Sequence, residues 1–283
     1  MSTNIPYLTE TWSPVTGCAP DYECWHRCWA RAMAHRFAKP FEPTFHSEAL
    51  AKPLHWKKPR RVGVSFYGDL FVGGITNEQI AAVFGVMAAC PQHTFLILTK
   101  RARRMEAWFK WVSRPGSYYP PDLLVQCEAR LLIGGQLPLH IIKGTPKCYP
   151  WPLPNVHIGV SVANQRDADE RIPHLLACPA AVRWVSYEPI TGPLNLEGYT
   201  GRGGVKCTAC GMKYGHDEAI GGTGCRGVDW VVAAAETGPG ARPLDLGWVR
   251  KVLDDCAAVQ VPFMFKNQVG YVNLDGQIHR GLP

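Results

Sequence analysis

The sequence lacks any continuous apolar run of about 18 residues, the length that a membrane-spanning helix needs. Its first residues, MSTNIPYLTETW, do not form the basic-then-apolar segment of a secretory signal. Charged residues are scarce, at 19%, while hydrophobic residues make up 46%, which is a globular composition and not a disordered one. We therefore expect a soluble cytoplasmic protein of a reducing compartment.

Acidic residues are fewer than basic ones, with 23 Asp and Glu against 30 Lys and Arg, so the formal net charge is +7. This balance disfavours a cationic partner and favours a polyanion such as nucleic acid. Aromatic residues make up 11% of the chain. They would supply stacking surface for a nucleic acid, or ordinary core if no nucleic acid is bound.

Cysteine, in contrast, is abundant, and its odd total of 11 argues against a complete disulfide framework. Cys18, Cys24 and Cys28 lie close together in TWSPVTGCAPDYECWHRCWARAMAHRF, residues 11–37. Three thiolates can hold a metal or an iron–sulfur cluster and leave one coordination position open for chemistry. A disulfide, three buried thiols, or a structural zinc site with a distant fourth ligand remain open, and His26 lies within the loop.

A second cysteine group lies in KCTACGMKYGHDEAIGGTGCRG, residues 206–227. The spacing of Cys207, Cys210, His216 and Cys225 predicts a small metal knuckle in a glycine-rich insert. Structural zinc is the favoured interpretation, and an auxiliary iron–sulfur cluster is the alternative. The remaining cysteines are interpreted as packing residues: Cys90, Cys127, Cys148, Cys178 and Cys256.

Apolar, strand-like runs alternate with helical stretches along most of the chain. Strands are expected at 7–15, 61–66, 94–99, 156–162, 182–187, 228–234 and 261–265, and helices at 25–38, 76–89, 103–112, 167–176 and 246–258. This alternation is typical of a parallel sheet covered by helices, so we predict one α/β domain over residues 1–283. Residues 114–154 and 197–227 are expected to be irregular inserts.

Polar side chains follow the expected strands at their carboxyl ends, where α/β proteins place their active sites. Each could instead cap a helix or lie in a solvated loop, but the whole series predicts a single pocket beside the first cysteine loop. The residues are Asp69, Lys100, Ser161, Asn164, Glu188, Glu236, Lys266 and Asn267.

Several blocks in this order resemble the phage and prophage radical S-adenosylmethionine-like proteins that carry an N-terminal three-cysteine motif. The blocks are TWSPVTGC (11–18), SFYGDLF (65–71), FLILTKRARRM (95–105), NVHIGVSVANQRDADERIPHLL (155–176), VRWVSYEPITGPLNL (182–196), VDWVVAAAETGPGARPLDLGWVRKVLDDC (228–256) and VPFMFKNQVG (261–270). The cysteine spacing departs from the commonest C-x3-C-x2-C pattern, because this loop reads C-x5-C-x3-C.

The resemblance implies a partial (β/α)6 TIM-like barrel with a 4Fe–4S cluster on Cys18, Cys24 and Cys28 and S-adenosylmethionine on the open iron. It also implies reductive cleavage of that cofactor to a 5′-deoxyadenosyl radical, with electrons from a donor such as a flavodoxin or ferredoxin. Cofactor contacts would come from Gly68, Asp69, Lys100, Ser161, Asn164 and Glu188, and substrate contacts from Glu236, Lys266 and Asn267.

The phage setting implied by the resemblance, together with the basic charge, points to DNA or a modified nucleotide as substrate. The leading hypothesis is isomerisation of a hypermodified base, such as a thymine carrying an amino-acid adduct, in the bacterial host cell. A duplex base would have to be extruded into the pocket. Two alternatives stay open: a radical lyase that repairs a DNA lesion, and a non-enzymatic, zinc-stabilised phage protein that binds nucleic acid.

Overall fold

The computed structural model describes residues 3–20, 23–134, 141–142, 145–146, 149–200, 227–238, 240–267, 270–271, 273–274, 277–278 and 280–283. The chain forms two compact units, Met1–His157 and Ile158–Pro283. Cys207, Cys210, His216 and Cys225, which were predicted to form the second metal site, lie outside the described residues, as does Cys148.

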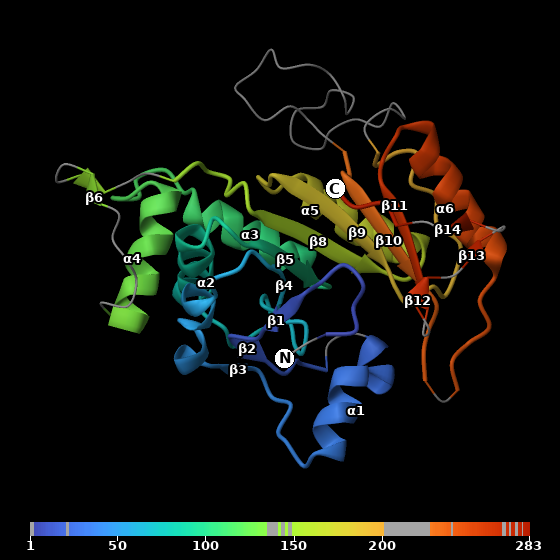
Figure 1. Ribbon diagram of the computed structural model, residues 1–283, viewed down its shortest axis with the longest axis horizontal. Helices are drawn as coiled ribbons and strands as arrows, with labels where there is room; N and C mark the ends of the chain where they lie inside the picture. The colour runs from blue at the N-terminus through green and yellow to red at the C-terminus, as the bar shows by residue number, and fades with distance from the viewer. Residues whose placement is uncertain are drawn as a thin grey trace. The chain divides into compact units, whose positions relative to one another are not determined.

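The first unit is built on three neighbouring parallel strands, β1 (Glu10–Trp12), β4 (Arg61–Val64) and β5 (Thr94–Thr99) (Figure 1). β4 lies between the other two strands. The helices of this unit are α1 (Trp29–Arg36), α2 (Asn77–Ala89), α3 (Ala102–Val112) and α4 (Pro121–Ile133). Shorter elements are β2 (Val15–Thr16), β3 (Thr44–Phe45), β6 (Ile141–Ile142), β7 (Thr145–Pro146), η1 (Glu23–Arg27), η2 (Ser47–Ala49) and η3 (Lys52–His55).

Helix α4 corrects the expectation that the whole of 114–154 is irregular. Pro121 occupies the first helical turn, where its fixed φ favours helix and its missing N–H is no loss. The helix packs against α2 at close range, since a Cβ on Gly85 would lie 2.1 Å from the Val125 carbonyl oxygen. Gly85 is therefore explained by this close approach of the two helices.

The first-unit core is rich in aromatic rings. Trp108 is fully buried, and its ring centroid lies 4.3 Å from that of Phe84. On the strand side, Trp12 packs against Phe95 at 5.8 Å. Burial of such large rings accounts for most of the stabilisation that holds α2 and α3 on the sheet.

The second unit contains β8 (Val156–Val162), whose first two residues belong to the first unit, followed by β9 (Val182–Tyr187), β10 (Trp230–Ala234) and β11 (Phe263–Asn267). β9, β10 and β11 are parallel neighbours, and β12 (Gly270–Tyr271) pairs with β11 antiparallel. The remaining elements are α5 (Gln165–Leu176), α6 (Leu246–Ala258), β13 (Asn273–Leu274) and β14 (Gln277–Ile278).

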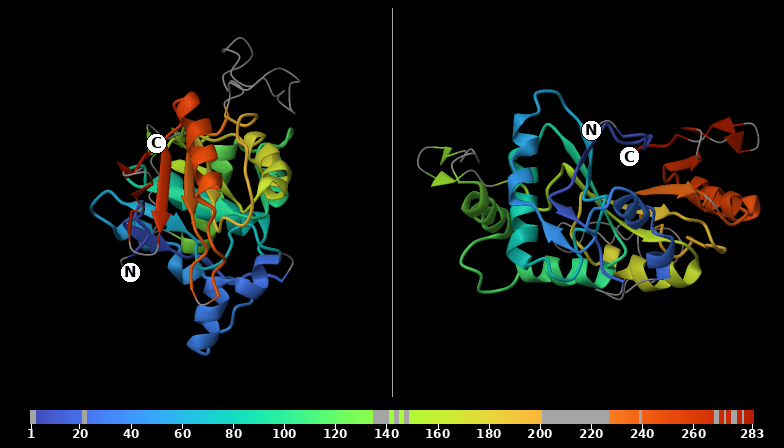
Figure 2. Two further views of the ribbon diagram at one scale, coloured as in Figure 1. Left: turned by 90° about the vertical axis from the view of Figure 1, so that its right-hand side faces the viewer. Right: turned by 90° about the horizontal axis from the view of Figure 1, so that it is seen from below.

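Parallel strands with intervening helices confirm the predicted α/β class. Expected and observed strands coincide at 94–99, 156–162 and 182–187, and helix 246–258 is also confirmed. The first strand is shorter than expected, and the helix expected at 25–38 is divided, because Cys28 is the extended N-cap between η1 and α1. Figure 2 shows α1 in blue, projecting away from β1 and β4.

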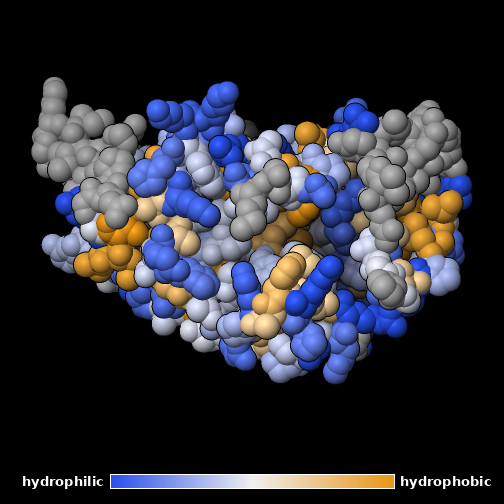
Figure 3. Space-filling model, turned by 60° about the horizontal axis from the view of Figure 1, so that its bottom comes forward, coloured by the Kyte–Doolittle hydropathy of each residue, from blue (hydrophilic) through white to orange (hydrophobic). Residues whose placement is uncertain are grey.

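Among the described helices, none combines the length and the hydrophobicity that crossing a bilayer demands. The face shown in Figure 3 is mainly hydrophilic, with smaller groups of apolar atoms between the polar ones.

Candidate functional site

The first cysteine loop is fastened to the carboxyl end of β4 by a contact between two glycines. Gly17 and Gly68 form an isolated parallel bridge, and a Cβ on Gly68 would lie 2.6 Å from the Gly17 carbonyl oxygen. Gly17 has φ +78°, and its own Cβ would lie 2.1 Å from the Glu42 carbonyl oxygen. Gly68, predicted to contact a cofactor, therefore has a packing role that already accounts for its lack of a side chain.

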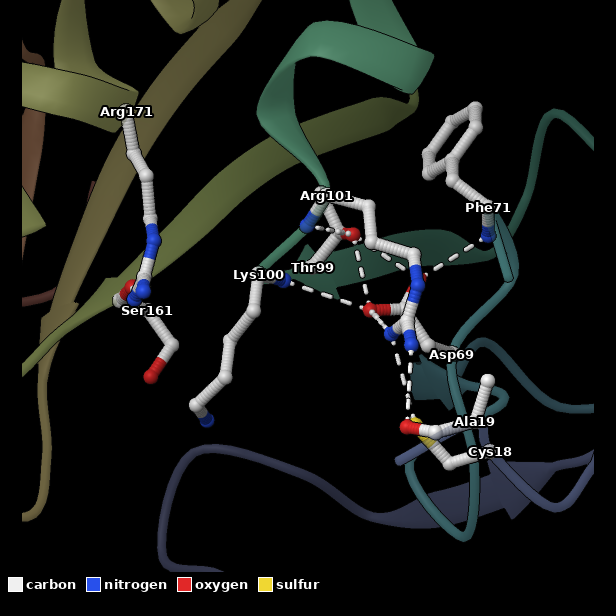
Figure 4. A network of polar contacts seen from close by, with 9 residues as sticks. All are labelled: Cys18, Ala19, Asp69, Phe71, Thr99, Lys100, Arg101, Ser161 and Arg171. Carbon is white, nitrogen blue, oxygen red and sulfur yellow. Dashed lines mark hydrogen bonds and ion pairs between the residues drawn. The ribbon is translucent and has the colours of Figure 1, made fainter. Parts of the chain in front are cut away.

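Cys18 follows this contact and is held from two sides. Its backbone N–H donates to the Phe41 carbonyl oxygen at 2.9 Å. Its Sγ accepts a hydrogen bond from Arg101 Nη1 at 3.3 Å, and Arg101 Nη2 donates to the Ala19 carbonyl oxygen at 3.4 Å. The thiol thus lies against a buried guanidinium at the carboxyl end of β5, as Figure 4 shows.

Asp69 lies on the other side of the same guanidinium, 3.3 Å from Nη1, and both side chains are buried. Its carboxylate also accepts hydrogen bonds from the N–H groups of Phe71 and Lys100 and from the Thr99 hydroxyl (Figure 4). These donors fix the position of the buried carboxylate. The arrangement favours a structural role for Asp69, joining β4 to β5.

Lys100, also a predicted cofactor contact, is half-buried, and its side chain points away from Asp69 (Figure 4). Only its main-chain N–H takes part in the Asp69 network, at 3.2 Å.

The electrostatic environment of Cys18 combines opposing effects. Burial raises the pKa of the Cys18 thiol, and this effect is the largest. Arg101 opposes it by charge and hydrogen bonding, while the Asp69 carboxylate raises the pKa further. On balance the pKa of Cys18 is raised, so the fold favours the protonated thiol.

Cys24 and Cys28 are half-buried and form no disulfide, like Cys18. Cys18 and Cys28 both pack against a small buried cluster made by Ala30, Ala34 and Phe41. As the described residues stand, no three His, Cys, Asp or Glu side chains are arranged to hold a metal ion. The prediction of a three-cysteine metal site therefore stays a prediction.

In the second unit, Glu188 and Lys266 form an ion pair, with Oε2 and Nζ 2.7 Å apart. β10 lies between their strands, and its Ala234 is in register with Lys266. The small alanine side chain leaves room for the two long side chains to meet above it. Two of the predicted strand-end residues, Glu188 and Lys266, therefore contact each other.

Ser161 and Asn164 have local partners. The Ser161 hydroxyl donates to the Glu188 carbonyl oxygen at 3.0 Å, and its own carbonyl oxygen accepts from Arg171 at 2.7 Å. Asn164 is the N-cap of α5 and accepts from the Asp167 N–H at 3.1 Å. Their predicted cofactor contacts are not tested by these bonds.

The Glu236 carboxylate accepts hydrogen bonds from Arg242, from Nε at 2.8 Å and from Nη2 at 3.0 Å. Its side chain is nearly buried beneath that of Arg242. The backbone of Asn267 ends β11. The prediction that all strand-end residues line one pocket stays a prediction.

Arg101 is a site residue that was not among the residues predicted from the sequence. The structure buries its side chain in contact with Asp69 and Cys18. A sequence signal did exist, because Arg101 directly follows a buried strand and precedes α3, where a side chain can turn inward.

A protein-family model described as "Protein of unknown function (DUF5131)" matches residues 2–280. The chain belongs to the DUF5131 family. No curated protein and no solved structure matches the chain. The matched range spans both units and both cysteine groups of the sequence.

Proposed function

We propose that this protein is a radical S-adenosylmethionine enzyme that acts on a modified base in nucleic acid. The observation that carries the proposal is the position of Cys18, which lies 3.3 Å from a buried arginine at the carboxyl end of parallel strands. That edge is where α/β enzymes place their reactive groups. Cys24 and Cys28 follow in the same loop, and none of the three cysteines forms a disulfide.

The donor set fits a 4Fe–4S cluster, because three half-buried cysteines outside any disulfide would serve three irons and leave the fourth open. Cys18, Cys24 and Cys28 would hold the cluster after drawing closer together, since they are not gathered as a metal site now. The chemistry supplied by this cofactor pair is one-electron cleavage of a carbon–sulfur bond in S-adenosylmethionine, which gives a radical able to abstract hydrogen.

The residues of the chain would position and shield this chemistry. Arg101 orients Cys18 through its hydrogen bond, and Asp69 fixes Arg101 in turn. The Phe41, Trp25 and Tyr67 rings beside the cysteines would limit the access of water. In the second unit, the Glu188–Lys266 pair offers both an acceptor and a donor for the polar groups of a cofactor or a substrate.

The substrate class follows from charge and from the predicted phage setting. The net charge of +7 favours a polyanion, and the proposed reaction is rearrangement of a hypermodified thymine. A radical repair lyase would share every residue named above and would differ only in the base that it accepts.

The test is anaerobic reconstitution with iron and sulfide, followed by electron paramagnetic resonance of the reduced protein. We expect a reduced-cluster signal that changes on addition of S-adenosylmethionine, together with release of 5′-deoxyadenosine. Cys18→Ser, Cys24→Ser and Cys28→Ser should each lose the signal. Cys127→Ser is the matched control, because Cys127 is a free, half-buried thiol on α4.

Zinc bound by the first loop, with no cluster after reconstitution, would overturn the enzyme proposal. If the cluster forms, incubation with DNA that carries an adducted thymine, or a pyrimidine lesion, separates isomerase from repair activity. Retention of iron by all three serine variants would show that the cysteines are not the ligands.

A further inference from the structure

Helix α1 exposes its large apolar side chains and buries small ones. Its buried residues are the small Ala30 and Ala34, whereas Trp29, Met33 and Phe37 are 58%, 40% and 59% exposed. These three positions are four residues apart, so they form one stripe along a single face of the helix. Large apolar side chains exposed in a row mark a binding surface more often than a fold requirement.

The surroundings of this stripe are basic. From Cys24 to Lys39 the sequence has no Asp or Glu, and its basic residues are His26, Arg27, Arg31, His35, Arg36 and Lys39. The Arg36 guanidinium lies 5.9 Å from the Phe37 ring centroid, and Arg31 lies 4.8 Å from that of Trp25. Figure 3 brings the α1 side of Figure 1 forward and shows pale orange atoms between blue ones.

The stripe is continuous with the first cysteine loop. Cys28 is the N-cap of α1, and the Trp29 ring meets the Tyr67 ring edge-on at 6.1 Å. Tyr67 directly precedes the Gly68 that contacts Gly17. The stripe therefore begins one residue after Cys28.

We propose that this face of α1 binds single-stranded nucleic acid, with bases stacked on Trp29 and Phe37 and a phosphate paired with Arg36. The inference deepens the proposed function and rests on it for the chemistry, but the binding itself needs no cluster. Trp29 and Phe37 are separated by about 12 Å along the helix, which leaves room for separate bases. Aromatic platforms with arginines are the usual means of binding a single strand without reading its sequence.

The charge distribution favours this occupant over a second copy of the chain. A symmetric dimer through α1 would bring one basic helix against another, with no carboxylate from Cys24 to Lys39 to compensate. A single strand supplies both the negative charge and the flat apolar faces that the stripe matches.

The test is fluorescence anisotropy of a labelled oligothymidine with the protein as purified, at several salt concentrations. Trp29→Ala/Phe37→Ala should weaken binding by about tenfold per ring, because each stacked base contributes about 1–3 kcal/mol. Arg36→Gln should weaken binding and reduce the salt slope by about 0.7, the value for one phosphate contact on a single strand. Tyr118→Ala and Arg130→Gln are matched controls at exposed positions outside α1 and should change neither quantity.

Equal binding of polyglutamate or anionic vesicles would overturn the inference. So would an unchanged affinity for the oligonucleotide in both the Trp29→Ala/Phe37→Ala protein and the arginine variant. A dimer that Trp29→Ala/Phe37→Ala dissociates would also overturn it. Circular dichroism and thermal unfolding identify variants that fail to fold. If the Trp29→Ala/Phe37→Ala protein is misfolded, the arginine variant tests the binding surface instead. Cys18→Ser should still bind the oligonucleotide. If the enzyme proposal fails, the protein will show no cluster chemistry but will still bind the oligonucleotide. The failure of the enzyme proposal can therefore be distinguished from the failure of this inference.

Discussion

Arg101 and Cys18 are 83 residues apart in the sequence, yet Nη1 of the arginine donates a hydrogen bond to Sγ of the cysteine at 3.3 Å. The same nitrogen lies 3.3 Å from the Asp69 carboxylate. The first cysteine loop is therefore joined to the ends of β4 and β5 by one buried guanidinium. Removal of either partner of Arg101 should affect both the fold and the loop.

We predict that Asp69→Asn lowers the free energy of unfolding by about 3 kcal/mol, because it leaves the Arg101 charge buried without its carboxylate. Asp69→Asn/Arg101→Met should be less destabilised than the sum of its single variants, since the unpaired charge is gone. Urea unfolding of the four proteins measures this coupling. Strictly additive effects would show that the ion pair has no special role.

Much of the framework could be predicted from sequence, because buried parallel strands read as short, continuous apolar runs. TFLILT at 94–99 and VRWVSY at 182–187 have the predicted bounds. Helix α4 was missed because proline and glycine on both sides suggested a loop, although Pro121 in fact starts the helix. Local composition alone does not tell a helix start from a turn.

The site was less predictable than the framework. Glu188 and Lys266 were both selected as strand-end residues, but their pairing across β10 depends on the strand order, which the sequence does not state. The contacts of Arg101 could not be predicted because its two partners come from distant segments of the chain. Contacts of this kind depend on the order of the strands in the sheet. The participating residue types can therefore be selected from the sequence, but their partners cannot.

Gly17→Ala should destabilise the protein more than Gly116→Ala. Both glycines have φ +78°, so both substitutions introduce the same backbone strain, about 1–2 kcal/mol. Only Gly17 has a neighbour in the way, the Glu42 carbonyl oxygen at 2.1 Å, whereas nothing lies within 4 Å of the Gly116 position. Thermal unfolding compares the two variants, and Gly17→Ala should also bind less iron on reconstitution. Equal melting temperatures would show that the loop tolerates displacement.

Ala234→Leu should break the Glu188–Lys266 pair, because it places a branched side chain in the space above β10. We expect a loss of about 1–3 kcal/mol in unfolding free energy and weaker binding of S-adenosylmethionine by isothermal calorimetry. Ala258→Leu, at the end of α6, is a control for the added volume. If Ala234→Leu binds the cofactor as the parent does, Glu188 and Lys266 do not contact it.

His157 should make stability depend on pH. It is buried, and burial together with the nearby Arg61 charge lowers its pKa to about 4, whereas an unfolded histidine titrates near 6.5. The neutral form is favoured by folding, so this contribution to stability is complete above pH about 6.5 and is lost as pH falls toward 4. The loss approaches about 3 kcal/mol, since one pKa unit corresponds to about 1.4 kcal/mol.

Urea unfolding at pH 7.5, 6.0 and 5.0 should show a steeper fall of the unfolding free energy for the parent than for His157→Gln, which has no titrating group at this position. The buried His93, whose pKa is also lowered, is present in both proteins. Its contribution to the pH dependence of stability is therefore the same in both and cancels in this comparison. Parallel pH profiles for the two proteins would mean that the His157 ring is solvated when folded.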